Sequence, residues 1–332
     1  MKLTKWQSRI LRIIGSMALV VGIFWFIPIS DVIASLRKVH LGYVAAGFAL
    51  NLLNSYGEAI QLWLLLKRVA VPAGLWTVFE TKMTTRFYGQ FLPSEFMAAA
   101  VKFYRLAGPT QQWGEVVAAL VFFRLVNMAA LALLGFAFWA IELPTGPGRW
   151  VGLVLIGAML ALVVMHFVLA NPRLTRHAAW LMSTRMFAWL KGRFVDKVRN
   201  LARTMLESYR RFGSVVWSII GLAVFRHLLG IVSFGLIALS LDIHLSILTI
   251  GWIRVVLQAI MTLPITLSGI GLREGTLVIL LQEYGVAASD AVALAFLIFA
   301  IGLVVNSLGG ILELKNFIRP GPATDAVRSD RE

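Results

Sequence analysis

The sequence has no cysteine, only five histidines and a small share of charged residues. Without cysteine the chain can form no disulfide, no thiolate metal site and no cysteine nucleophile. The histidines are scattered without ligand spacing, and no Walker motif for nucleotide phosphates occurs, so we expect neither a metal ion nor another cofactor. Charged residues make up 14% of the chain, well below the share in soluble domains. This composition excludes an ordinary soluble protein.

Hydrophobic residues, in contrast, make up 59% of the chain and gather in long runs. Each run is long enough to cross about 30 Å of hydrocarbon as a helix. The runs are continuous rather than alternating, which favours helices over the strands of a membrane barrel. We therefore predict an all-α, polytopic membrane protein. Its full spans, about six in number, are expected at residues 10–27, 41–66, 115–141, 150–170, 214–241 and 287–312.

The net charge of +15 lies mainly in the predicted loops on one side of the membrane. Residues 171–213 alone hold ten Lys and Arg against Asp196 and Glu207. By the positive-inside rule this side is cytoplasmic, so we expect an inner-membrane protein with both termini in the cytoplasm and no nucleic-acid partner. The linker 171–213 has the spacing of an amphipathic helix that would lie on anionic lipids, but an ordinary linker explains its charge equally well. We expect one membrane domain over 1–316 and a disordered cytoplasmic tail over 317–332.

Two further apolar segments, 75–107 and 246–284, are interrupted by proline, glycine and polar residues. Each contains a Leu-Pro pair, with Pro93 in the first and Pro264 in the second. Because proline ends a helix and apolar helical sequence resumes after it, each segment is expected to consist of two shorter helices joined by a turn.

The two prolines lie 171 residues apart, and the same offset superimposes the apolar runs of the two halves of the chain. We predict an internal repeat with copies over about 41–141 and 212–312. The charge rule puts both ends of the first interrupted segment in the cytoplasm and both ends of the second outside, so each must be a re-entrant hairpin. One span between the copies inverts the second, and in such repeats the broken helices meet near the midplane of the bilayer.

The second hairpin contains the stretch ITLSGIGLREGTL at 265–277. Gly269 and Gly271 would permit a tight turn, and Arg273 and Glu274 would begin the next half-helix, where a glutamate suits the helix dipole. An arginine beside a bent backbone can hold phosphate bidentately. The alternative, a glycine loop for a nucleotide, needs a preceding strand that this chain lacks.

Ionisable side chains also occur within the apolar runs, where each lone charge costs roughly 2.5 to 3.5 kcal/mol on insertion scales. Arginines outnumber glutamates among them, so we expect a polar cavity with surplus positive charge that suits a phosphate-bearing headgroup. Structural roles stay open: Glu58 could pair with Arg86 or Arg124 to fix helix packing, and Arg254 could snorkel to the interface. The predicted substrate-binding residues are Glu58, Arg86, Glu95, Arg124, Arg226, Arg273 and Glu274.

Both interrupted segments resemble a known family. LPITLSGIGLRE at 263–274 looks like the C-terminal signature of the transmembrane domain of lysylphosphatidylglycerol synthases and their free-standing flippase-like relatives, and FLPSEFMAAAVKFYRL at 91–106 is similar to the first-half signature. The resemblance covers residues 10–316 and implies movement of a lipid between leaflets, with glycosylated, aminoacylated or polyprenyl-linked lipids as examples. The fused synthases carry a soluble aminoacyl-transferase domain, whereas this chain ends about twenty residues after its last predicted span, so transfer chemistry is not implied.

We therefore predict a lipid flippase that works without a bound nucleotide. Its expected partners are a membrane lipid, as substrate, and anionic lipids at the cytoplasmic face. Two other functions remain open: a membrane-embedded transferase that uses Glu95 or Glu274 as a base, and a non-transporting scaffold. A homo-oligomer is compatible with the sequence.

Overall fold

The computed structural model describes residues 21–91, 95–144, 211–261 and 269–318, with single positions between 150 and 208. All elements in this part of the chain are helical, and it contains no strand. The prediction of an all-α protein is therefore confirmed for the described residues. Most of the predicted spans 10–27 and 150–170, the linker and the tail lie outside them.

In the first half of the chain, helices α2 to α6 follow the helical residues 21–26, and in the second half α10 to α13 follow a short 3-10 turn. Those of the first half are α2 (Ile29–Arg37), α3 (Leu41–Arg68), α4 (Leu75–Phe91), α5 (Glu95–Ala107) and α6 (Trp113–Glu142). Those of the second half are η3 (Arg211–Ser214), α10 (Val216–Leu239), α11 (Ile247–Met261), α12 (Leu272–Gln282) and α13 (Ala288–Ile318).

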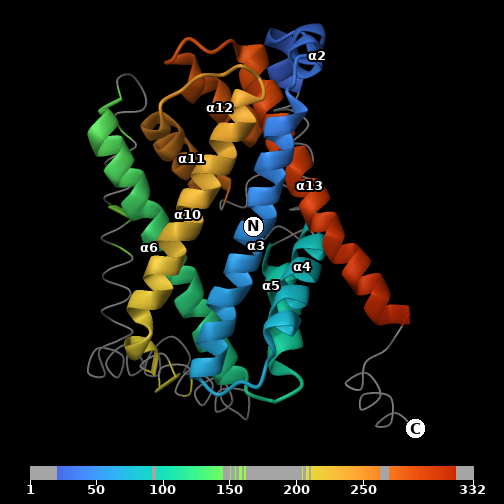
Figure 1. Cartoon of the computed structure of the whole chain (residues 1–332), viewed down its shortest axis with the longest axis vertical. Coiled ribbons are helices and arrows are strands. Elements are labelled where there is room, and N and C mark those ends of the chain that lie inside the picture. Colours follow the sequence, from blue (N-terminus) through green and yellow to red (C-terminus); the bar gives the residue numbers. More distant parts are fainter. Residues whose placement is uncertain are drawn as a thin grey trace, which may run out of the picture.

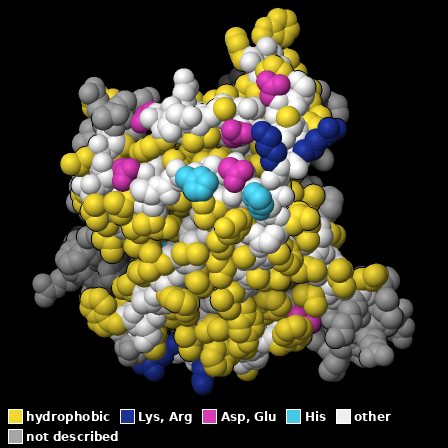
Figure 2. Space-filling model, turned by 45° about the horizontal axis from the view of Figure 1, so that its top comes forward, with side chains coloured by type: hydrophobic (Ala, Val, Ile, Leu, Met, Phe, Trp, Pro, Cys, Tyr) yellow, Lys and Arg dark blue, Asp and Glu magenta, His cyan; other side chains and the backbone are white. Residues whose placement is uncertain are grey.

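Three described helices are long and apolar enough to cross a membrane: Trp113–Glu142, Val216–Leu239 and Ala288–Leu314. They coincide with three of the predicted spans. Helix α3 is 28 residues long but carries polar side chains along its middle, among them Asn54, Glu58 and Gln61. Figure 2 shows hydrophobic side chains over the middle of the visible face and charged side chains towards its two ends. The chain is thus a multi-pass membrane protein with a helix of mixed character at its centre.

Helices α3 and α10 lie side by side at the centre of the molecule and run in opposite directions (Figure 1). Helices α4 and α5 occupy the lower half of the view, α11 and α12 the upper half, and α6 and α13 flank the central pair on opposite sides. Helix α4 packs against α5 and α13, while α11 packs against α12 and α6. Each shorter pair of helices is therefore held by the long helix of the other half of the chain.

Glycine allows the closest of these helix approaches. A Cβ atom built on Gly309 of α13 would lie 2.1 Å from the carbonyl oxygen of Met83 in α4. A Cβ atom built on Gly251 of α11 would lie 2.4 Å from Cδ2 of Phe138 in α6. Small residues at such contacts let helix backbones approach closely, which is the usual source of packing energy between helices in lipid.

The apolar side chains form two separate buried clusters. The lower cluster contains Leu62, Leu65, Val78, Phe122 and Ile219, and the upper cluster contains Ile231, Phe234, Trp252, Leu277 and Leu294. On α10, Ala223 belongs to the lower cluster and Ile231 to the upper one. Arg226 lies between these two positions, so a buried charged side chain lies at the boundary between the two apolar clusters.

Candidate functional site

A single carboxylate, Glu58 in the middle of α3, lies at the centre of a cluster of buried charges. Its Oε2 atom lies 2.5 Å from Nζ of Lys82, and its Oε1 atom lies 2.9 Å from Nη2 of Arg226. Arg86 approaches the same carboxylate, with Nη2 at 3.2 Å from Oε2. Lys82 and Arg86 stand one turn apart on α4, so both face α3, whereas Arg226 reaches in from α10.

Neutral polar side chains complete the contacts of Arg226. Its Nη1 atom donates to Oε1 of Gln61 at 2.6 Å and to Oδ1 of Asn127 at 2.7 Å. The ring of His227 lies 3.1 Å, through Nε2, from the carbonyl oxygen of Asn127. Because Asn127 belongs to α6 and Gln61 to α3, the cluster joins α3, α4, α6 and α10.

The cluster is buried and carries surplus positive charge. Lys82 is 5% exposed and Arg226 is 3% exposed. Three basic side chains share the one carboxylate of Glu58, which leaves a formal charge of +2. Buried ions are tolerated only when their partners repay much of the lost hydration. An anionic group would therefore be stabilised at this place.

The structure brings together three of the residues predicted from sequence: Glu58, Arg86 and Arg226. Arg124, which was expected near them, has an exposed side chain on α6, so the pairing of Glu58 with Arg124 is not seen. Sequence reasoning missed Lys82 and Gln61. Lys82 could have been found by its position four residues before Arg86, because this spacing places both on one helix face.

The glycine-rich stretch of the second half begins α12. Gly269 and Gly271 have φ angles of 76° and 83°, in the left-handed region that glycine enters at low cost. Glu274 is buried, and its Oε2 accepts the backbone N–H of Gly271 at 2.7 Å, so the carboxylate caps the start of α12. The guanidinium of Arg273 lies over the ring of Phe299, 5.0 Å from its centroid.

The remaining predicted residues cannot be placed in the charged cluster. Pro93 and Pro264 lie outside the described residues. Glu95 is the first residue of α5, and its side chain lies outside the described part of the chain. Neither Arg273 nor Glu274 contributes one of the contacts that surround Glu58.

A second carboxylate, Glu313 of α13, ties the lower pair of helices to the long helix of the other half. It pairs with Arg105 of α5 and accepts the hydroxyl of Tyr88 in α4 at 3.0 Å. The side chains of Arg105 and Glu313 are 30% and 24% exposed. Glu313 therefore links α4, α5 and α13 through side-chain contacts.

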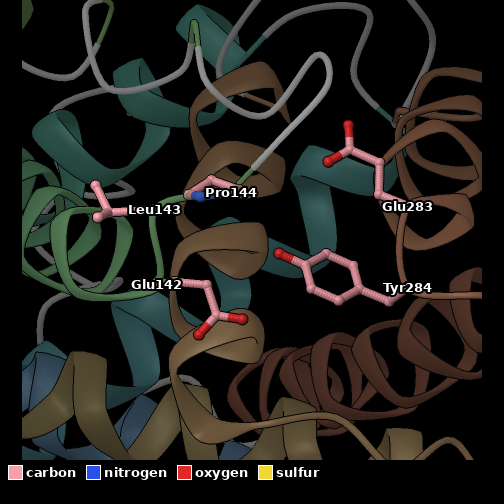
Figure 3. A pocket seen from close by; sticks show the side chains of 5 residues that line it. All are labelled: Glu142, Leu143, Pro144, Glu283 and Tyr284. Atoms are coloured by element: carbon pink, nitrogen blue, oxygen red, sulfur yellow. The ribbon is translucent and has the colours of Figure 1, made fainter.

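An open pocket lies at the opposite end of the molecule, between the end of α6 and the loop after α12 (Figure 3). It is lined by Glu142, Leu143, Pro144, Glu283 and Tyr284. Glu142 accepts the hydroxyl of Thr249 at 2.6 Å. Burial raises the pKa of the Tyr284 phenol above its ordinary value. The pocket is acidic and stands apart from the positively charged cluster around Glu58.

Comparison with known proteins gives one match over most of the chain. A family model described as the lysylphosphatidylglycerol synthase TM region matches residues 13–310. No curated protein matches the chain, and neither does any solved structure.

Proposed function

The chain belongs to the lysylphosphatidylglycerol synthase transmembrane family, and we propose that it carries a lipid with an anionic headgroup from one membrane leaflet to the other. The observation that carries this proposal is the cluster around Glu58. In a chain whose middle must be surrounded by hydrocarbon, three basic side chains converge on a single carboxylate. Ionisable residues inside a membrane are costly to keep, so they are a mark of function rather than of packing.

An inverted repeat would place this cluster where a transporter needs it. The offset of 171 residues maps α3 on α10, α4 on α11 and α6 on α13. The packing follows the same correspondence: α4 packs on α13, and its counterpart α11 packs on α6, the counterpart of α13. The central pair α3 and α10 is antiparallel, and the two shorter helix pairs lie in opposite halves of the molecule. These features support two re-entrant hairpins that enter from opposite faces, as in transporters with sites at the midplane.

The charges at the two ends favour one orientation in an inner membrane. Lys67, Arg68 and Arg211 lie at the lower end, where α3 ends and η3 begins, and the acidic pocket of Figure 3 lies at the upper end. The positive-inside rule then makes the lower end, where α13 also ends, cytoplasmic. The cytoplasmic position of both termini stays a prediction from the sequence. The cluster around Glu58 falls between the two apolar clusters, near the middle of the bilayer.

The proposed mechanism uses the cluster as a relay for the headgroup while the lipid tails stay in the bilayer. An entering anionic group competes with the Glu58 carboxylate for Lys82 and Arg86, which are the cations of α4. Because α4 belongs to one hairpin and Arg226 to the central helix pair, this exchange of partners changes how the hairpin is held. Movement of one repeat against the other would then open the site to one leaflet at a time.

Reconstituted vesicles test this proposal. The purified chain is placed in vesicles that contain a tail-labelled fluorescent phosphatidylglycerol, and dithionite is added outside to bleach the accessible label. We expect bleaching well beyond the outer-leaflet share with the wild type and an initial rate at least 10-fold lower for Lys82→Gln, whose loss removes a cation from the relay. Arg37→Gln, at the exposed end of α2, serves as the matched control.

Three results would count against the proposal. Bleaching equal to that of protein-free vesicles, with folded protein present, would exclude transport of this lipid class and favour a scaffold. A new covalent lipid product found by mass spectrometry would instead indicate a membrane-embedded transferase. An unchanged rate in Lys82→Gln would separate transport from the charged cluster.

A further inference from the structure

A fourth basic side chain, Arg254 in the middle of α11, lies close to the charged cluster without joining it. A Cβ atom built on Gly230 of α10 would lie 2.0 Å from its Nη2 atom and 2.5 Å from its Cζ atom. The guanidinium therefore occupies the space that any other residue at position 230 would fill. Glycine at this position admits a charged group between two helices of an apolar core.

At least one hydrogen-bond donor of Arg254 has no acceptor within the described part of the chain. Its Nη1 atom is buried and has no acceptor there. No carboxylate of the described residues forms an ion pair with it. Glu58 is within electrostatic range of Arg254 but is already shared by three other cations. A buried guanidinium without an acceptor is costly, because charged donors lose strong hydrogen bonds to water.

The neighbouring arginine has an unused donor as well. The Nε atom of Arg226 is buried without an acceptor, although both of its Nη atoms are engaged. Gly230 follows Arg226 by four residues, so the two positions lie on one face of α10, roughly 6 Å apart. The contact between α10 and α11 therefore holds two unsatisfied guanidinium donors, one from Arg226 and one from Arg254, which packs at the position of Gly230.

We infer that this place between α10 and α11 is a subsite for a phosphate-type oxyanion, held by Arg254 and supported by Arg226. Guanidinium groups match the oxygens of phosphate in pairs, and one such anion has enough oxygens for donors on adjacent turns. Its negative charge would also offset the surplus cations. The inference rests on the proposed function and adds the group that is recognised: the phosphate of the lipid headgroup.

The subsite also gives the two hairpins different parts in recognition. Lys82 and Arg86 belong to α4, in the first hairpin, whereas Arg254 belongs to α11, in the second. A phosphate held by Arg254 would lie beside the central helix α10, and any further polar part of the headgroup could then face Glu58 and its partners. Binding of one lipid would in this way contact both repeats.

Lipid retention by the purified full chain tests the subsite. Native mass spectrometry in dodecyl maltoside would compare dioleoyl phosphatidylglycerol with dioleoylglycerol, which has the same tails and no phosphate. We expect the wild type to retain the phospholipid at least 10-fold better than dioleoylglycerol, and Arg254→Gln to lose most of this preference. Arg254→Lys should keep part of it, because the charge remains while the paired donors are lost.

A pair of glycine substitutions supplies a matched control. Gly230→Ala places a methyl group where the Arg254 guanidinium lies, whereas a Cβ atom on Gly221 of the same helix meets nothing within 4 Å. Gly230→Ala should therefore lose the preference for the phospholipid, and Gly221→Ala should keep it. Thermal unfolding of each variant shows whether it is folded at the temperature of the assay. If Gly230→Ala does not fold, the test uses the lipid retention of Arg254→Lys and Arg254→Gln compared with that of the wild type.

The outcomes separate this inference from the proposed function. Equal retention of phosphatidylglycerol by the wild type, Arg254→Gln and Gly230→Ala would overturn the subsite even if the wild type transports lipid. Loss of retention in both variants, with no lipid movement in vesicles, would support the subsite and reject transport. Thermal stabilisation of the wild type by millimolar inorganic phosphate, without phospholipid preference, would assign the anion to solution and reject the headgroup as its source.

Discussion

Replacement of Glu58 by glutamine should destabilise the protein far more than replacement of any one of its basic partners. Glutamine keeps the size of the side chain and one acceptor oxygen but removes the negative charge. At separations of 2.5 to 3.2 Å, each of the three contacts corresponds to a gross attraction of roughly 5 to 7 kcal/mol at an effective dielectric constant near 20. Most of this gain offsets desolvation, and breaking one buried pair costs about 3 to 5 kcal/mol.

The expected loss of stability is much smaller for the basic side of the cluster. Lys82→Gln removes one of three cations and leaves the carboxylate with Arg86 and Arg226. Since the remaining charges are better balanced, we expect a loss below about 1 kcal/mol. The double variant Glu58→Gln with Lys82→Gln should be more stable than the sum of the two single changes predicts, by about 0.5 to 3 kcal/mol.

Reversible unfolding in mixed micelles of dodecyl maltoside and SDS, followed by tryptophan fluorescence and circular dichroism, gives these free energies. Glu80→Gln is the control, because Glu80 is a carboxylate whose one hydrogen bond, from Trp76, is exposed, and a change within about 0.5 kcal/mol is expected. If Lys82→Gln cost as much as Glu58→Gln, the cluster would hold no surplus positive charge. The argument for an anionic substrate would then lose its basis.

Three further changes test other parts of the structure in the same unfolding assay. Gly309→Ala should lower the free energy of unfolding by roughly 1 to 3 kcal/mol or more, because its methyl group would meet the backbone of α4 at 2.1 Å. Gly302→Ala on the same helix meets nothing within 4 Å and should be neutral or stabilising. Equal effects of the two changes would contradict the close helix contact. Arg105→Gln should lower the free energy of unfolding by about 1 kcal/mol or less, because the side chains of Arg105 and Glu313 are both partly exposed. A loss above about 3 kcal/mol would indicate a fully desolvated ion pair. Glu274→Ala should lower the free energy of unfolding by about 0.5 to 2 kcal/mol, because the cap on α12 is lost. Glu274→Gln keeps an acceptor oxygen and should lower it less. The reverse order would show that the fold depends on the charge of Glu274 and not on the cap.

The helices of the fold could be predicted because their cause is local. Long apolar runs that cannot leave backbone groups unpaired in lipid must be helical, and α6, α10 and α13 lie where such runs occur. The start of α12 could be predicted because the backbone before it has positive φ angles that favour glycine, at Gly269 and Gly271. Residues 41–66 were predicted as a span in the same way, and α3 is helical there, but the polar residues along its middle lower its hydropathy and it is not among the three apolar candidates.

The candidate site was only partly predictable. The presence of buried charge at Glu58, Arg86 and Arg226 followed from their positions within apolar runs. Lys82 was missed although it lies in the same segment as Arg86, because the four-residue spacing that puts both on one helix face was not considered. Arg124 was predicted as a substrate-binding residue and as one of two possible partners of Glu58, yet its direction around α6 exposes it.

The sequence by itself determined that this chain is a helical membrane protein of a lipid-related family, since hydropathy and the signature stretches act within a few turns of helix. Only the tertiary structure decided which charges meet. Glu58 and Arg226 are 168 residues apart, and their contact depends on the antiparallel packing of α3 against α10. The packing of α11 against α10 likewise sets Arg254 against Gly230. Side-chain direction and helix register are properties of the assembled helices, and no local pattern specifies them.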